Sequence, residues 1–560
     1  MGYAHEYATA ILHRGRIPME PADFVPDWAD RPRKAKYYPG AESVPLPDGG
    51  YPGSATITAG CLPDAGPGSH LRTGSGEAPG TAFTLPLLSG MLLDSYGLTG
   101  RRLGVQANTD LAALPHYTQA NWSRGTASGG GLYPVSVYWV SGPSGPLTPG
   151  VHHYSPPRHS MVRLLAGDVT GEMRAALGAH GETTDQYLVL GVKYWQNAFK
   201  YNSFSFHAVS MDVGALLQTW QMWARARGLR LAPALWFDEA RLARLLGLGE
   251  DEEGLFAVVP LHWDGQRPAS PVPAASAPVS SAPVSSAPVS SAPVGEPTGA
   301  AVPHRDQERS RTVLEFGTLL RIHRATAEHA TARPAPGALH DTGPAAPATS
   351  AEPVPLPRAE FPEVSVREAL RTRRSSFGRF DASVPTTPAQ LATTLAACAA
   401  TRLDSDAEPP GTPRQTRLYA FVNHVDGIEP GAYAYEPDTH TLHLVAPGAP
   451  GGFLQENYFL SNYNLEQTGA VIVPTLRTAA ILDAVGDRGY RLVNATVGAI
   501  AQTFYTASAA LGLGAGVALG FDNISYIEKL RLEDTGEAPL LIMLLGNERP
   551  HPADFRSAIA

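Results

Sequence analysis

Residues 200–238 (KYNSFSFHAVSMDVGALLQTWQMWARARGLRLAPALWFD) align without a gap with residues 484–522 (AVGDRGYRLVNATVGAIAQTFYTASAALGLGAGVALGFD). Within this alignment Gly214 falls on Gly498, which is 284 residues later. A repeat on this scale indicates a duplicated domain rather than a solenoid of short units. Two copies in one chain can pack as a covalent pseudo-dimer and divide between them the work that a symmetric dimer does twice.

A second match begins at Gly150 (GVHHYSPPRHSMVRL) and at Gly431 (GAYAYEPDTHTLHL). Each copy mixes strand-like alternation with one long helical run, so we predict an α+β fold made of two tandem domains. Strands are expected over 132–140, 187–194, 418–423, 470–474 and 539–545, and helices over 210–227, 366–372 and 494–510.

The chain of 560 residues is long enough for two or three domains. We expect an irregular N-terminal cap over 1–85, a first domain over 86–266, a linker over 267–357 and a second domain over 358–560. The linker carries a tandem Ser-Ser-Ala-Pro-Val repeat, which cannot bury enough apolar surface to order itself. Residues 311–331 within it have helical spacing, and that segment either docks on the fold or binds a partner.

The composition excludes several classes of protein. A hydrophobic content of 43% with 17% charged residues is typical of a globular protein, and the net charge of −9 argues against nucleic-acid binding. No apolar run approaches the length of a membrane span, and no basic-then-apolar leader opens the chain, so a cytoplasmic location is expected. The two cysteines cannot form a metal cluster of their own, and the histidine pairs have no third ligand, so no metal is expected.

A basic cluster opens the second copy. Arg373, Arg374 and Ser375 follow a short helical stretch, and Arg379 comes one turn later. Guanidinium groups and a hydroxyl within one turn form a good phosphate-binding site, because arginine offers a planar fork of donors. The alternative is an ordinary solvated basic helix end.

A glycine-rich element lies in the first copy, just before a predicted strand. It consists of Ser128, Gly129, Gly130 and Gly131 within the string TASGGGLYP. Three glycines let backbone N–H groups approach a ligand closely, and the serine hydroxyl adds a directed donor. A plain tight turn is the alternative interpretation.

These two elements resemble known motifs. Arg-Arg-Ser at the head of such a domain resembles the flavin-phosphate motif of the nitroreductase family, whose members bind FMN at a dimer interface. The string TASGGGLYP resembles the Ser-Ala-Gly-Gly-Leu-Tyr-Pro element of the SagB-type azoline oxidases, a branch of that family. The resemblance implies catalytic roles for Lys200 and Tyr201, which lie where that branch carries a Lys-Tyr pair. Phe377 departs from the family pattern, which usually has a second basic residue there, and either Arg549 or Arg556 could supply the late phosphate contact.

The two copies have lost different residues. The second copy has Ala484-Val485 in place of Lys200-Tyr201. It also has 410–414 (PGTPR) in place of the Ser-Gly-Gly element, while it keeps a loop with Gly514, Gly516 and Gly520. The first copy has no Arg-Arg-Ser and carries Trp236 where the second has Gly520. The surviving sets belong to opposite halves, so we predict one composite FMN site per chain.

The resemblance implies an FMN-dependent dehydrogenase that oxidises thiazolines or oxazolines to thiazoles or oxazoles in a ribosomally made peptide. A leader-bearing peptide substrate and a cyclodehydratase partner are implied as well, with oxygen reoxidising the flavin. Two alternatives remain open: a related flavin oxidase acting on carrier-bound or small heterocycles, and a flavin-free subunit that binds a peptide for a partner enzyme.

Overall fold

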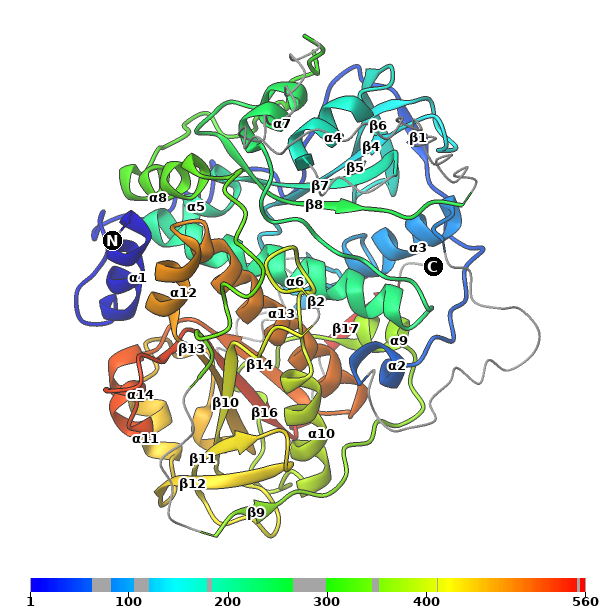
Figure 1. Cartoon of the computed structure of the whole chain (residues 1–560). Coiled ribbons are helices and arrows are strands. Elements are labelled where there is room, and N and C mark those ends of the chain that lie inside the picture. The colour runs from blue at the N-terminus through cyan, green and yellow to red at the C-terminus, as the bar shows by residue number, and fades with distance from the viewer. Residues whose placement is uncertain are drawn as a thin grey trace, which may run out of the picture.

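The computed structural model describes residues 2–62, 82–104, 120–178, 184–264, 299–344, 352–409, 411–550 and 554–558. Its fold mixes helices and sheets, as the sequence predicts. Two large antiparallel sheets occupy opposite halves of the molecule, and two long helices cross between them (Figure 1). Of the predicted linker over 267–357, residues 267–298 and 345–351 lie outside the described residues.

The sheet of the first half has the order β1-β6-β5-β4-β7-β8. Its strands are β1 (Ser43–Pro45), β4 (Val135–Ser141), β5 (Gly150–Ser155), β6 (Ser160–Ala166), β7 (Gln186–Lys193) and β8 (Glu253–Pro260). The sheet of the second half has the order β14-β16-β13-β10-β11-β12-β9, with β15 pairing β13 off this path. Its strands are β9 (Val354–Pro355), β10 (Thr416–Val422), β11 (Gly431–Glu436), β12 (Thr441–Pro447), β13 (Ala470–Leu476), β14 (Gly514–Ala518), β15 (Ala538–Pro539) and β16 (Ile542–Gly546).

The two sheets share their central strand order and an irregularity. In each, four successive antiparallel strands run in the order β6-β5-β4-β7 or β12-β11-β10-β13. The pairing of β5 with β6 shifts between Val151 and His152, and that of β11 with β12 shifts between Ala432 and Tyr433. Both shifts fall in the region where the sequence repeats with a spacing of 281 residues.

The long helices α6 (Ser205–Arg225) and α13 (Gly489–Ala510) pack against each other at the centre of the molecule. A Cβ on Gly214 would overlap the carbonyl oxygen of Ala495, and a Cβ on Gly498 would overlap that of Met211. The repeated glycines therefore let the two backbones approach at a crossing where a side chain has no room. Both helices are buried on nearly every side, which is why α6 carries apolar residues all around.

The remaining helices pack on the two long helices, on one another or on the sheets. They are α2 (Ile57–Cys61), α3 (Leu85–Ser95), α4 (Thr170–Leu177), α5 (Trp195–Tyr201), α7 (Glu239–Leu246), α9 (Val366–Thr372), α10 (Pro388–Ala399), α11 (Gly451–Glu456), α12 (Thr478–Val485) and α14 (Asn523–Leu530). Among the described residues, no helix combines the length and the apolarity that crossing a membrane requires.

The N-terminal region is more regular than the predicted cap. Helix α1 (Tyr3–His13) buries Ala4, Tyr7 and Ile11 and packs against helices of both halves. Strand β1 adds an edge to the first sheet. The segment Tyr3–His13 contains no Pro or Gly, and the helix was missed because the overall composition of the region indicated irregular structure. A short helix of this kind is stabilised mainly by tertiary packing.

The helical segment inside the predicted linker packs on the fold. Helix α8 (Gly317–Glu328) buries Leu319, Ile322, His323 and Thr326 and contacts α1, α6 and α13. The preceding Val313 and Leu314 lie outside the helix and are exposed. Of the two interpretations of this segment, the structure favours docking on the fold.

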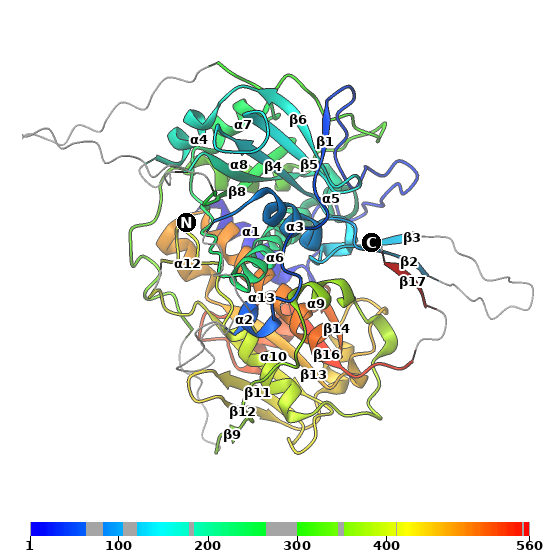
Figure 2. The same cartoon turned by 90° about the vertical axis from the view of Figure 1, so that its right-hand side faces the viewer.

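The end of the described chain crosses to the first half. Strand β17 (Asp554–Ala558) pairs with β2 (Gly100–Gly104), which pairs in turn with β3 (Ala120–Ser123). These three strands stand to one side of the two main sheets (Figure 2). The halves on either side of the predicted boundary at 358 are therefore not independent in structure, because the last strand of the second half pairs with a strand of the first half.

Candidate functional site

The glycine-rich element is a tight turn, η1 (Gly129–Gly131), held by a carboxylate. Gly130 and Gly131 have φ of 62° and 64°, a conformation that favours glycine. The Ser128 hydroxyl donates to Oδ2 of Asp212 at 2.6 Å, and the Gly129 N–H donates to Oδ1 at 2.8 Å. The Tyr133 N–H in turn donates to the Ser128 hydroxyl at 2.8 Å, which closes the turn.

Asp212 was missed by the sequence reasoning. It lies on α6 and is 7% exposed. Burial raises the pKa of its carboxyl to about 7, and the hydrogen bonds from Ser128 and Gly129 act in the opposite direction. The sequence did place this carboxylate within a long, mostly apolar helix. Because a buried acid needs hydrogen-bonding partners, that position could have identified Asp212 as a candidate site residue.

Lys200 and Tyr201 lie against this turn. They end α5, which follows β7. A Cβ on Gly130 would lie 2.5 Å from Tyr201 Oη and 2.8 Å from Lys200 Nζ. The structure thus brings the predicted Lys-Tyr pair together with the glycine-rich element, and the missing side chain of Gly130 makes that approach possible.

Arg373 links the second half to the same loop. It caps the C-terminus of α9, and its Nε and Nη2 donate to the carbonyl oxygens of Gly125 and Arg124 at 2.8 and 3.0 Å. Gln502 on α13 binds the loop as well, because its Oε1 accepts from Ala127 N–H at 2.8 Å. The two predicted elements are therefore joined directly across the two halves.

The other basic residues converge on a carboxylate that the sequence reasoning did not single out. Arg374 and Arg379 both donate to Oε2 of Glu548, Arg379 at 3.0 Å. Ser375 Oγ shares a hydrogen bond of 2.8 Å with Tyr505 Oη of α13. Glu548 lies two residues after β16 ends. It is an isolated acidic residue outside any motif, so the sequence did not identify it as a site residue.

Strand β14, on the open edge of the second sheet, begins at this basic cluster. The Ser376 N–H donates to the carbonyl oxygen of Ala515, and the Ala515 N–H donates to Ser376 Oγ, both at 2.7 Å. A Cβ on Gly514 would overlap Glu548, and one on Gly516 would lie 2.5 Å from the Tyr463 ring. The protein's own side chains therefore account for these two glycines.

Gly520 lies beyond the end of β14. Its carbonyl oxygen accepts from Phe459 N–H at 2.9 Å. Just before it, the Leu519 carbonyl oxygen accepts from Arg14, whose guanidinium also lies 5.1 Å from the Phe204 ring. Phe204 neighbours Tyr201, with ring centroids 6.2 Å apart. Gly520 is thus connected to the Lys-Tyr side of the site through Arg14 and Phe204.

Further cations surround the loop. Arg124 is 4% exposed, and its guanidinium lies 4.2 Å from the Tyr133 ring and 4.7 Å from the Tyr96 ring. Within the described part of the chain, its Nη1 has no hydrogen-bond acceptor. Burial lowers the pKa of Lys34, and the charges of Arg124 and Lys200 lower it further. Such a concentration of positive charge attracts an anionic ligand.

The backbone is strained beside each predicted element. Tyr133, Asn202 and Phe377 have φ of 52°, 42° and 50°, although none is glycine. They follow the glycine-rich turn, the Lys-Tyr pair and the Arg-Arg-Ser cluster, respectively. Strain of this kind costs about 1–3 kcal/mol per residue and is concentrated at functional sites.

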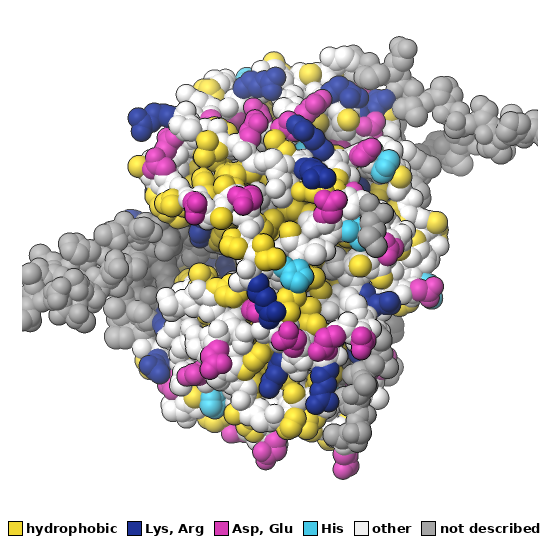
Figure 3. Space-filling view, turned by 90° about the vertical axis from the view of Figure 1, so that its left-hand side faces the viewer, with side chains coloured by type: hydrophobic (Ala, Val, Ile, Leu, Met, Phe, Trp, Pro, Cys, Tyr) yellow, Lys and Arg dark blue, Asp and Glu magenta, His cyan; other side chains and the backbone are white. Residues whose placement is uncertain are grey.

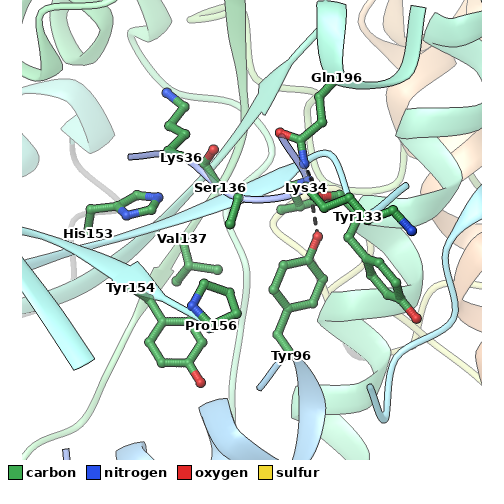
Figure 4. Close-up of a pocket in the computed structure, with 12 residues that line it drawn as sticks. Lys34, Lys36, Tyr96, Tyr133, Ser136, Val137, His153, Tyr154, Pro156 and Gln196 are labelled. Atoms are coloured by element: carbon green, nitrogen blue, oxygen red, sulfur yellow. Dashed lines mark hydrogen bonds between the residues drawn. The ribbon is translucent and has the colours of Figure 1, made fainter. Parts of the chain in front are cut away.

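A small cavity adjoins the loop. Lys34 and Tyr133 lie on one side of it, and His153 and Tyr154 on the other (Figure 4). Its volume of about 10 Å³ is room for about one water molecule, so it cannot hold a flavin. A larger cavity of about 570 Å³, lined by residues of 402–414 and Asp438, lies in the second half and includes none of the predicted site residues.

The donor set fits the phosphate of FMN, the cofactor that the resemblance implies. Arg373, Ser375 and the buried Nη1 of Arg124 are donors of the kind that phosphate selects. The described residues also offer no acceptor to the N–H groups of Leu519 and Gly520, which leaves two donors beyond β14. Arg549 lies beside the cluster, its N–H bonded to the Arg379 carbonyl oxygen at 2.8 Å, whereas the side chain of Arg556 lies outside the described residues.

No group of three or more His, Cys, Asp or Glu side chains in the described ranges is arranged to hold a metal ion. His153 is buried, and burial lowers its pKa to about 3, so the imidazole is neutral at physiological pH. Nε2 of His323 donates to the Glu250 carbonyl oxygen at 2.9 Å, and its Nδ1 shares a hydrogen bond of 2.8 Å with Tyr194 Oη. His153 packs between the rings of Tyr38 and Tyr138, and His323 is held by its two hydrogen bonds.

Comparisons with known proteins place these observations in a family context. Residues 370–547 match the model of the nitroreductase family. A nitroreductase-like protein of Methanocaldococcus jannaschii is 32% identical over 139 residues, which cover 23% of this chain and 64% of that protein. The match therefore spans slightly less than two thirds of the length of this relative.

Solved structures add a likeness over nearly the whole chain. A crystal structure from Anabaena variabilis, of a protein assigned to the nitroreductases, superposes with a TM-score of 0.68 at 20% identity and covers 98% of this chain and 100% of that one. The Escherichia coli microcin synthetase McbBCD complex, with truncated pro-MccB17 bound, covers 32% of this chain and 70% of its own at 16% identity. Its TM-score of 0.28 is too low to support an argument. The chain thus has a nitroreductase-like fold, and its residues 370–547 match the nitroreductase family model.

Proposed function

We propose that the chain is an FMN-dependent dehydrogenase that oxidises thiazolines or oxazolines to the aromatic azoles in a ribosomally made peptide. The observation that carries the proposal is the contact of Lys200 and Tyr201 with Gly130, in a loop that Arg373 holds from the other half. The two halves then act as copies of one domain packed as an intramolecular pseudo-dimer. The equal sheet orders and the paired glycines of α6 and α13 support this interpretation.

The cofactor is held by residues of both halves in this proposal. Arg373, Arg374, Ser375 and Arg379 bind the phosphate, and the strand edge that contains Gly514 and Gly516 and leads to Gly520 borders the rest of the ligand. The turn Ser128–Gly131 approaches from the first half. When bound, FMN accepts the hydride that leaves the substrate and so supplies the redox chemistry.

The chain's own residues handle the proton. Oxidation of an azoline removes a proton from one ring carbon and a hydride from its neighbour. Lys200 Nζ or Tyr201 Oη takes the proton, and contact with Gly130 fixes the position of both groups. Asp212 holds the turn that carries Gly130, and the strained backbone at Asn202 directly follows the pair.

The surroundings suit a flat, apolar ring on a flexible peptide. Trp28 is 50% exposed, and its ring lies 5.9 Å from Lys200 Nζ. On the face that carries α1, hydrophobic side chains gather across the middle of the molecule, where the two halves meet (Figure 3). A leader-bearing peptide, delivered by a cyclodehydratase partner, is the proposed source of the ring.

The decisive experiment is a single turnover without oxygen. Purified protein is reconstituted with FMN and mixed with a synthetic azoline peptide, and the flavin absorbance and the peptide mass are followed. Bleaching together with loss of two hydrogens from the peptide supports the proposal. Flavin binding without bleaching by peptides points to a small or carrier-bound heterocycle, and no flavin binding at all points to a peptide-binding subunit.

The phosphate assignment has its own test. Arg373→Ala removes charge-assisted hydrogen bonds worth about 1.5–3 kcal/mol each, so the dissociation constant of FMN is expected to rise at least tenfold. Arg358→Ala, in the extended segment before α9, is the matched control and leaves affinity unchanged. Wild-type affinity in the Arg373 variant would show that the phosphate lies elsewhere.

A further inference from the structure

Two short segments occupy equivalent places in the two halves. Ala234 pairs with Val258 in the first half, and Ala518 pairs with Ile542 in the second. All four residues obey the spacing of 284 that relates the long helices. The residues that follow, Leu235-Trp236 and Leu519-Gly520, are therefore structural counterparts.

The N–H groups of these counterparts have different partners. Leu235 N–H donates to Oδ1 of Asp406 at 2.8 Å, and Trp236 N–H donates to Oδ2 at 3.2 Å. Asp406 belongs to the second half, so this carboxylate reaches across the molecule. For the N–H groups of Leu519 and Gly520, the described residues provide no acceptor.

The residue that corresponds to Asp406 explains the difference. Asp406 lies ten residues before the start of β10, and Gly125 lies ten residues before the start of β4. Gly125 has no side chain that could reach Leu519 and Gly520, and a Cβ there would overlap the carbonyl oxygen of Asp94. One half therefore carries a carboxylate at this place, and the other half cannot.

Further contacts lock the carboxylate in position. Arg333, which follows α8, donates from Nε to Asp406 Oδ2 and from Nη2 to the Trp236 carbonyl oxygen, both at 2.9 Å. The Asp406 N–H donates to the Pro233 carbonyl oxygen at 3.1 Å. The Asp406 side chain is 11% exposed, and Trp236 is 1% exposed. The two backbone N–H groups are thus bonded to a largely buried carboxylate at a closed interface between the halves.

We infer that the chain contains a second composite ligand site, related to the first by the internal repeat, which its own Asp406 side chain closes. The carboxylate satisfies the two N–H groups that remain available to a ligand in the other site. Trp236 fills the space beside them, and Arg333 holds the closure. The inference rests on the proposed composite site for the identity of the ligand, but the closure itself is a property of the apoprotein.

The test compares backbone amide exchange at the two places. Hydrogen exchange is measured by mass spectrometry on peptides that contain Leu235-Trp236 and Leu519-Gly520, with and without FMN. We expect slow exchange at Leu235-Trp236 in both conditions, and fast exchange at Leu519-Gly520 that FMN slows at least tenfold. Protection of Leu235-Trp236 only after FMN addition, or two FMN per chain, would overturn the closure.

Variants separate this inference from the proposed function. Asp406→Ala is expected to speed exchange at Leu235-Trp236 at least tenfold, with FMN content unchanged. Asp406→Asn, which keeps the shape and one acceptor oxygen, gives a smaller increase and guards against misfolding of the alanine variant. Asp404→Asn, an exposed carboxylate two residues away, is the matched control. If no FMN binds, the proposed function fails, yet these exchange rates still decide the closure: unchanged exchange in both Asp406 variants refutes it.

Discussion

Gly130 is the residue around which the candidate site is arranged. It is exposed and has a left-handed backbone, and the terminal atoms of Lys200 and Tyr201 lie where its side chain would be. Hydrogen bonds hold the loop around Gly130 in place. Ser128 donates to Asp212, and Arg373 donates to the Gly125 carbonyl oxygen at the start of the loop. A general base must be held within reach of its proton, and this set of contacts provides such a placement.

At the scale of single residues, we predict that Lys200→Ala and Tyr201→Phe bind FMN normally but oxidise substrate slowly. Loss of a general base typically costs about 10²–10⁴ in rate, whereas loss of a surface side chain costs almost nothing. The measurement is anaerobic flavin bleaching in a single turnover. Lys529→Ala, a lysine on α14 that packs on Phe453, is the control. Wild-type bleaching in both variants would place the base elsewhere, with Tyr133, His207 and Tyr490 as the next groups to test.

Asp212 gives a prediction about pH. Its pKa is raised from 3.8 to about 7, so the folded state binds a proton that the unfolded state releases within this window. The stability that this proton contributes is complete below about pH 4 and is lost as the pH rises toward about 7, by up to about 4 kcal/mol. Asp212→Asn removes the dependence. The free energies of unfolding of the two proteins, measured by urea titration, are therefore expected to converge or cross as pH rises and to keep a constant difference above about pH 8.

A second variant checks the cause of that shift. The hydrogen bond from Ser128 lowers the pKa of Asp212, so Ser128→Ala is expected to move the pH-dependent region upward. If the difference in the free energy of unfolding between wild type and Asp212→Asn does not change with pH, burial does not raise the pKa of this carboxyl.

At the scale of elements, the crossing of α6 and α13 is the most constrained contact in the fold. We predict that Gly214→Ala lowers the free energy of unfolding by about 1–3 kcal/mol. The added Cβ would meet the backbone of α13, which cannot move aside as a flexible side chain could. Thermal unfolding measures the loss. Gly171→Ala is the matched control: that helical glycine on α4 has open space around it, so alanine there is neutral or stabilising. Equal midpoints for the two variants would refute the close approach.

The elements that could be predicted are those whose pattern is local. The helix α9 has the predicted bounds, and β7, β10 and β13 lie within one or two residues of theirs, because buried strands and capped helices carry strong periodic signals. Helix α1 was missed, since a short helix depends on packing, here against α8 and α12. The pairing of β17 with β2 joins chain segments that are far apart, so no local pattern could announce it.

The candidate site divides in the same way. The residue types that bind phosphate or bend a backbone were visible in the sequence as clusters, and the structure brings the Arg373 cluster and the Ser128–Gly131 turn together. Asp212, Arg124 and Glu548 were not visible as site residues. Each is a single charged residue whose role follows from the partner that folding places beside it.

At the scale of the whole molecule, one hydrophobic core runs through both halves and includes residues of α6, α13 and α8. The site elements come from both halves, with Lys200 in the first and Arg373 in the second, and the hydrogen bond from Arg373 to Gly125 joins them within one chain. The chain is therefore expected to bind one FMN, with no contribution from a second copy.

Complementation between two defective chains tests this arrangement. Chains that carry Lys200→Ala and chains that carry Arg373→Ala are co-expressed with different tags and purified through both. If each site were built between two chains, a mixed pair would contain one site with both residues intact, and activity would return. We expect no recovery of activity. Each site is formed by the two halves of one chain, so every site in the mixed sample contains one altered residue. Oxidation by the mixed sample well above the sum of the two single variants would show that the halves combine between chains, and would replace the intramolecular pseudo-dimer with an exchanged one.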